Sequence, residues 1–337
     1  MKRMPAALAA KMAAVMIAVR VFTTLTIDGH HFLNSGWLCV LIGTAVSIPL
    51  AAVADKYLIG KINSGKNILY RMVYVIYFVY TAYQCAAVMR LLINSVSYSN
   101  LQIVPPIGIS VFLMLAGVYI VAKNGVGIGG ASKMCAIGLC IMGTVVLLAG
   151  IGELHISWLT PVFGPGKRAL IKGALIVFGQ MAAGVLLVLL ADDKGRYECV
   201  KSVAAGGIGA CVMCAYWSAM TPVQFTKHMN RLTGIELFLS NGRTSLAVLL
   251  PISLIWFTEL LIAMYGSLYG AAASLRSVAA DVKSAAAAAA SALAALVIAT
   301  AGLAESDILR KVMEFSWILA VCVLVLIIRR RRYADEV

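Results

Sequence analysis

The sequence predicts an all-α polytopic membrane protein with ten transmembrane helices. Of its 337 residues, 62% are hydrophobic and 12% are charged, and the mean hydropathy is +0.93. Soluble domains average roughly 45–50% apolar and about 25% charged residues, so the composition excludes a soluble protein. The polar stretches between the apolar runs are too short for a separate folded domain. We therefore expect residues 1–337 to form a single transmembrane domain.

Ten apolar runs have the length of about 20 residues that a helix needs to cross a bilayer. They lie at 5–26, 35–54, 68–95, 104–122, 131–151, 169–191, 200–220, 244–273, 284–303 and 311–329. The first run follows Lys2 and Arg3 as in a signal peptide, but it continues past the usual apolar length, so we interpret it as a span. Lys and Arg are more frequent in the loops on the side of the N-terminus, which indicates that both termini are cytoplasmic.

The charged and sulfur-containing residues indicate no nucleic-acid, metal or cofactor site. The net charge of +14 comes from residues spread over short loops, as topology requires, and not from one basic face. The eight cysteines lie mostly inside apolar runs, without zinc-ligand spacing, and are expected to pack as small hydrophobic residues. No GxSxG, HExxH or P-loop pattern occurs, so we expect no enzyme and no catalytic residues.

Ten spans divide into two five-helix halves, 5–151 and 169–329. Because five is odd, the halves have opposite orientations, and bundles of this kind often bind a ligand where the first helix of each half is broken. In the second half, Gly173, Gly179 and Gly184 interrupt the first helix. The sequence Phe178-Gly179-Gln180 places a hydrogen-bonding side chain at mid-membrane depth, which predicts a break and a ligand-binding site there. The alternative is that these glycines serve helix packing alone.

The first helix of the first half lacks such a signal. From residue 12 to residue 27 it contains no Gly or Pro, and its polar residues include Arg20, Thr23 and Thr24. A break here would have to use these side chains, which we therefore include among the candidate ligand-binding residues. The alternative is an unbroken helix whose Arg20 extends to the interface or pairs with an acidic residue.

An acidic residue lies deep in the eighth predicted span. Placing a charge at this depth costs roughly 2.5–3.5 kcal/mol on insertion scales, so we expect Glu259 to have a functional or structural role. Trp256, Glu259, Ala263 and Gly266 share one helical stripe, and the small residues indicate that this stripe faces protein. We expect Glu259 either to carry a coupling proton or to form a structural ion pair with Arg20.

The third span contains buried tyrosines at Tyr77, Tyr80 and Tyr83. Each phenol hydroxyl needs a partner at that depth. A ligand carboxylate is one candidate partner, and a carbonyl of another helix is the alternative.

Several motifs resemble one family. Residues 158–166 (WLTPVFGPG), 172–174 (KGA) and 178–180 (FGQ) are similar to the NLxPxxxxG…KGA…FGE stretch of the GerAB-type B subunits of spore germinant receptors. The pair Pro105-Pro106 and residues 234–239 (GIELFL) agree with that family too. The wider group is the amino acid–polyamine–organocation permease superfamily.

The resemblance implies a leucine-transporter-like fold, a location in the endospore inner membrane, and recognition of a small germinant, such as an amino acid, beside A and C subunits. Gln180 stands where the family often has Glu; it can donate and accept hydrogen bonds but cannot titrate. The resemblance favours a germinant receptor subunit. The alternatives are a proton-coupled amino acid permease that uses Glu259, and a scaffold whose pocket is vestigial.

Overall fold

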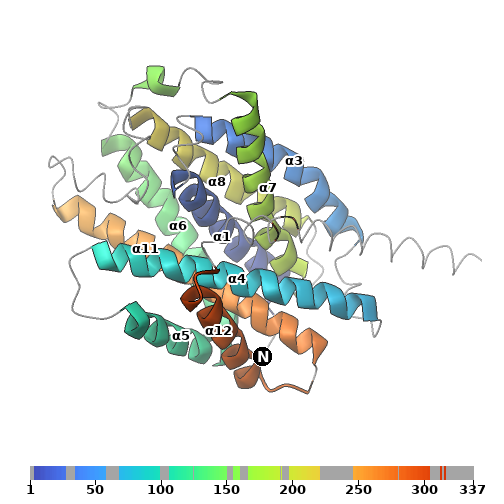
Figure 1. Cartoon of the computed structure of the whole chain (residues 1–337). Helices are drawn as coiled ribbons and strands as arrows, with labels where there is room; N and C mark the ends of the chain where they lie inside the picture. The colour runs from blue at the N-terminus through green and yellow to red at the C-terminus, as the bar shows by residue number, and fades with distance from the viewer. Residues whose placement is uncertain are drawn as a thin grey trace, which may run out of the picture.

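In the computed structural model the chain is a bundle of long helices (Figure 1). The structure describes residues 4–27, 35–57, 68–98, 106–123, 125–149, 155–159, 166–189, 191, 197–220, 246–279, 281–303, 312 and 315. Within these residues every regular element is helical. The elements are α1 (Ala6–Ile27), α3 (Gly36–Tyr57), α4 (Ile68–Tyr98), α5 (Pro106–Lys123), α6 (Gly125–Ala149), the 3-10 helix η4 (Ile156–Leu159), α7 (Lys167–Leu189), α8 (Glu198–Met220), α11 (Leu246–Val278) and α12 (Ser284–Thr300).

The predicted spans agree with the observed helices wherever the structure describes them. The largest differences are that α6 begins at Gly125 instead of 131, and that α11 continues to Val278 instead of 273. The glycine-rich residues before 131 form the start of α6, because in a membrane the backbone gains from satisfying its own hydrogen bonds. The predicted span 311–329 lies outside the described residues except for Val312 and Phe315.

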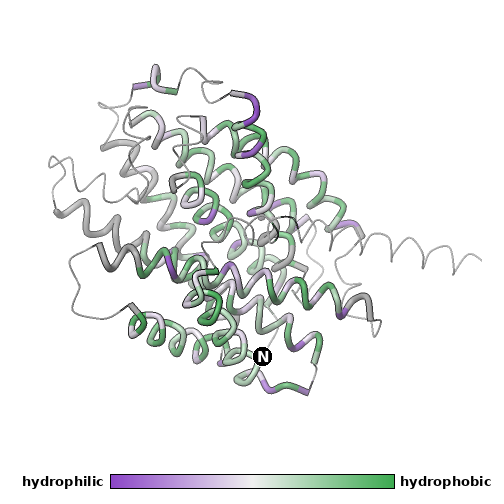
Figure 2. Tube along the Cα trace, viewed as in Figure 1, coloured by the Kyte–Doolittle hydropathy of each residue, from purple (hydrophilic) through white to green (hydrophobic). Residues whose placement is uncertain are grey.

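The described helices have the character of membrane spans. The helices α1, α3, α4 and α8 each contain a segment that is long and apolar enough to cross a bilayer. Apolar residues dominate along the helices in Figure 2. Large apolar side chains also point outward, including Phe112 at 71% exposure and Met134 at 70%. An outward apolar surface is what a lipid-embedded helical protein requires, because lipid replaces water around it.

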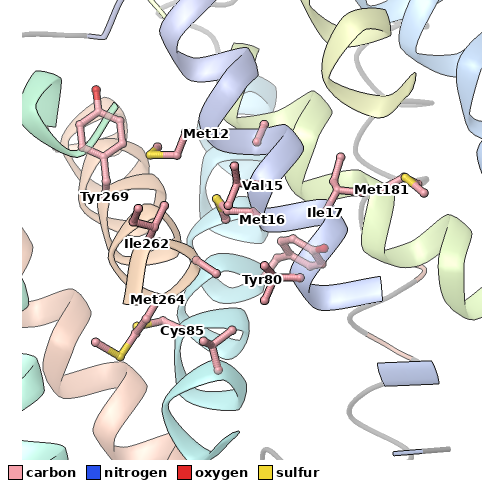
Figure 3. Close-up of a cluster of buried hydrophobic side chains, with 14 of the residues drawn as sticks. Met12, Val15, Met16, Ile17, Tyr80, Cys85, Met181, Ile262, Met264 and Tyr269 are labelled. Atoms are coloured by element: carbon pink, nitrogen blue, oxygen red, sulfur yellow. The ribbon is translucent and has the colours of Figure 1, made fainter. Parts of the chain in front are cut away.

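The helix α1 forms the centre of the bundle. It packs against α6, α7, α8 and α11, and most of its apolar window is buried. Figure 3 shows side chains of α1 in one cluster with those of α4, α7 and α11. The labelled members are Met12, Val15, Met16, Ile17, Tyr80, Cys85, Met181, Ile262, Met264 and Tyr269. A helix that is apolar on all sides can occupy such a position because it has no face that needs water.

Close helix approach depends on glycine at the α1 contacts. A Cβ at Gly206 of α8 would lie 2.7 Å from the Cβ of Ile17. A Cβ at Gly266 of α11 would lie 2.8 Å from the Sδ of Met16. At Gly206 the next atom is the backbone carbonyl of Ala14 at 2.8 Å, so α8 reaches α1 only because this position lacks a side chain, whereas at Gly266 the flexible Met16 side chain can adjust.

Candidate functional site

The predicted site brings α4 and α7 together at mid-helix. The Tyr80 hydroxyl donates a hydrogen bond of 3.2 Å to the carbonyl oxygen of Gly179. One turn further along α4, the Nε2 of Gln84 donates to the Oε1 of Gln180 at 3.4 Å. Tyr80 and Gln84 are four residues apart and therefore share one face of α4. The structure thus joins Tyr80, Gly179 and Gln180, three of the predicted ligand-binding residues, and adds Gln84 to them.

The predicted break at Phe178-Gly179-Gln180 is wrong, because α7 is one continuous helix from Lys167 to Leu189. Gly184 lies within the same uninterrupted helix. Glycine permits a break but does not impose one, and unwinding here would release backbone groups into an apolar core that offers them few partners. Phe178 is buried beside these residues at 8% exposure.

The helix α1 is also continuous through Arg20, so of the two alternatives the unbroken helix is the one observed. The Thr23 hydroxyl donates to the carbonyl of Val19 at 2.8 Å within the same helix. A hydroxyl satisfied in this way has less to offer a ligand. Thr24 is half-buried on the same helix.

The three candidate tyrosines of α4 are buried: Tyr77 is 3% exposed, Tyr80 0% and Tyr83 2%. For Tyr80 the partner is a carbonyl of another helix, which was the alternative to a ligand carboxylate. Its hydroxyl links α4 to α7 through the bundle interior, which gives the buried phenol the partner that it needs.

Gln84 was not predicted. It is 2% exposed, and its Oε1 has no hydrogen-bond partner. In the orientation described, the Nε2 of Gln84 is used by Gln180 and the Oε1 remains as a buried acceptor. In the sequence, Gln84 is the polar residue one helical turn beyond Tyr80. That spacing was the available signal.

Glu259 is completely buried in α11, and neither of its carboxyl oxygens has a hydrogen-bond partner. The predicted stripe does face protein: Ala263 is fully buried, and Gly266, two turns from Glu259, contacts Met16 of α1. The predicted ion pair with Arg20 is not formed among the described residues. Arg20 itself is buried at 6% exposure. An unsatisfied buried carboxyl is costly, which makes Glu259 a candidate for binding a proton or a ligand.

In the described part of the chain, no group of three His, Cys, Asp or Glu side chains could hold a metal ion. Of the family-like motifs, the structure describes Trp158 and Leu159 in η4, whereas residues 160–165 and 234–239 lie outside the described residues. The backbone N–H of His155, just before η4, donates to the carbonyl of Ala219 at 3.0 Å, which ties η4 to the end of α8.

No protein-family model matches this sequence, and no curated protein matches it. The residues and their geometry therefore carry the functional argument.

Proposed function

We propose that this chain is the B subunit of a spore germinant receptor, a transporter-like bundle that binds a small amino acid germinant beside A and C subunits. In this proposal the chain lies in the endospore inner membrane with both termini in the cytoplasm. The family-like motifs of the sequence support the receptor assignment. The support for the transporter-like fold comes from helix packing.

The packing has the pattern of two related halves. If the first five spans correspond in order to the last five, α1 corresponds to α7, α3 to α8, α4 to α11 and α5 to α12. Each of these four helices packs against its own counterpart. The cross pairs agree as well: α1 packs against α8, and α3 packs against α7. A pseudo-twofold axis through the bundle accounts for all of these contacts and supports a 5+5 inverted repeat.

The correspondence extends to single residues. A Cβ at Gly206 would lie 2.7 Å from the Cβ of Ile17, and a Cβ at Gly43 would lie 2.7 Å from the Cβ of Val177. In both contacts the added Cβ would also lie 2.8 Å from a backbone carbonyl, that of Ala14 beside Ile17 and that of Ala174 beside Val177. Each carbonyl precedes the branched residue by three positions. The α8–α1 contact is therefore repeated by the α3–α7 contact.

These contacts align the two halves. Pairing Gly43 with Gly206 pairs Thr44 with Gly207, and a Cβ at Gly207 would meet the Thr44 side chain. Two residues related by a twofold axis can touch each other only where they lie beside that axis. The contact between Thr44 and Gly207 is therefore what the proposed axis requires. Pairing Ile17 with Val177 makes Arg20 the counterpart of Gln180.

The observation that carries the binding proposal is the buried amide pair of Gln84 and Gln180 beside the Tyr80–Gly179 hydrogen bond. The unsatisfied Oε1 of Gln84 leaves a hydrogen-bonding position for a ligand in the interior of the bundle. In the proposal the ligand lies between α1, α4, α7 and α11, near Arg20 and Gln180, and binding shifts the bundle toward a signalling conformation.

Equilibrium binding of labelled small L-amino acids to the chain in lipid nanodiscs tests this site. Gln84→Met keeps the length of the side chain and removes its polar atoms, and we expect it to weaken binding by about tenfold or more. The control is Thr81→Val, because the buried Thr81 hydroxyl is already satisfied by the Tyr77 carbonyl at 2.8 Å. Equal affinities of the two variants, or no binding by the wild type, would contradict the proposal.

A proton-coupled amino acid permease is the second candidate, and the unsatisfied carboxyl of Glu259 favours it. Uptake into proteoliposomes with an imposed proton gradient separates the two functions. Binding without accumulation supports the receptor subunit, whereas accumulation driven by the gradient supports the permease.

A further inference from the structure

An aspartate of one helix caps the start of another at one end of the bundle. Asp55 lies in the last turn of α3, and its two carboxylate oxygens each accept a hydrogen bond of 3.0 Å from α8, one from the N–H of Cys199 and one from the N–H of Val200. These are two of the N–H groups that a helix leaves without an intrahelical partner at its start. We call this contact the Asp55 cap.

The cap replaces one that α8 cannot supply itself. The Tyr197 carbonyl accepts the helical bond from the N–H of Lys201 at 2.9 Å, which makes Tyr197 the capping residue of α8. A helix is ordinarily capped by a short polar side chain at this position, and tyrosine has none. The carboxylate from α3 takes that role, and its negative charge suits the positive end of the α8 dipole.

The backbone at this junction is strained. Tyr197 has φ of +61°, in the left-handed region that residues with a Cβ rarely adopt. Its side chain is 54% exposed, so packing around the ring does not explain the conformation. Strained backbone persists where neighbouring contacts fix it, and the Asp55 cap is one contact that holds the start of α8.

The opposite end of the same interface lacks the cap. The alignment of Gly43 with Gly206 makes Ser218 the counterpart of Asp55. The Ser218 hydroxyl donates to the carbonyl of Cys214 in its own helix, at 2.8 Å, and does not cap α3. Among the described residues, the aligned positions therefore differ: Asp55 caps the neighbouring helix, whereas Ser218 bonds within its own helix.

We propose that the Asp55 cap holds this end of the α3–α8 interface closed, and that its release is the movement by which the bundle opens there. Strain at Tyr197 favours release, and the two charge-assisted hydrogen bonds favour closure, so the two states can be balanced. The inference rests on the two-repeat fold of the proposed function but not on the identity of the ligand. The positions of Lys and Arg in the sequence predict that this end faces the cytoplasm.

Cys199 provides a native probe of the cap. Its side chain is fully buried in the capped turn, with the thiol 3.8 Å from the carbonyl of Val185 in α7, and we expect opening to expose it to a maleimide. Labelling rates of each cysteine can be read by mass spectrometry on the full chain in nanodiscs without ligand. We expect Asp55→Ala to raise the labelling rate of Cys199 about tenfold or more. Asp55→Asn keeps one acceptor oxygen and should give an intermediate rate.

Two further variants make the test specific. Ser218→Ala, at the symmetry-related position, should leave Cys199 as protected as in the wild type. Tyr197→Gly removes the strain of the closed state and should lower the Cys199 labelling rate below that of the wild type. Cys85 and Cys214 are buried elsewhere in the bundle and report loss of the whole fold.

Two outcomes would overturn the inference. One is a Cys199 labelling rate in Asp55→Ala equal to that of the wild type. The other is a joint rise at Cys199, Cys85 and Cys214, because that would mean general unfolding and not opening at one end. Neither outcome depends on amino acid binding, so failure of the cap is distinguishable from failure of the proposed function.

Discussion

Replacing Gly206 by alanine tests the close packing of α8 on α1. The added Cβ would lie 2.7 Å from the Cβ of Ile17 and 2.8 Å from the backbone carbonyl of Ala14. Ordinary contacts between such atoms are about 3.5–4.0 Å, so the helices would have to move apart by nearly an ångström, and a backbone carbonyl cannot rotate away. Overpacking of this kind costs about 1–3 kcal/mol. A loss of about 2 kcal/mol changes the folding equilibrium by roughly thirtyfold.

Gly209→Ala is the matched control in the same helix. Its Cβ would lie 3.6 Å from the Cβ of Ala18, which is an ordinary contact. Alanine should therefore be tolerated there, with a gain of up to about 1 kcal/mol from helix propensity. The free energy of unfolding in mixed micelles with increasing denaturing detergent measures both variants. Equal stabilities of Gly206→Ala and Gly209→Ala would refute the packing argument.

Further predictions concern Gly43, Tyr80 and Glu259. Gly43→Ala should lower the free energy of unfolding by about as much as Gly206→Ala, because the α3–α7 contact repeats the α8–α1 contact, and a much smaller loss would count against the two related halves. Tyr80→Phe removes the hydrogen bond to Gly179 and should cost about 1 kcal/mol in the same assay. Glu259→Leu should stabilise the protein by about 1–3 kcal/mol by removing two unsatisfied oxygens, and Glu259→Gln should abolish the pH dependence of any uptake.

The helices were predictable because the membrane imposes length and composition on each one separately. A run of about 20 apolar residues identifies a span without any knowledge of its neighbours. The glycine-rich start of α6 was not predicted, because glycine is common both in loops and in tightly packed membrane helices. The expected break at Gly179 failed for a related reason: glycine allows two conformations, and α7, which packs against α1, α3 and α8, adopts the helical one.

The site was only partly predictable because its contacts join distant segments. Tyr80 and Gln180 were identified from their depth in separate spans, but the pairing of Gln84 with Gln180 depends on how α4 lies against α7. Asp55 has an ordinary sequence position, next to a lysine at the end of a span. Its role as a cap appears only once α8 is placed beside it.

In the proposed two-repeat arrangement Arg20 corresponds to Gln180, and this pairing bears on how a ligand would be oriented. If the two halves had identical side chains, a ligand on the axis would meet the same groups on both sides. It could then bind in two equivalent orientations. Here one half contributes a guanidinium and the other a neutral amide. An asymmetric molecule such as a zwitterion would then have one preferred direction, with its carboxylate toward α1.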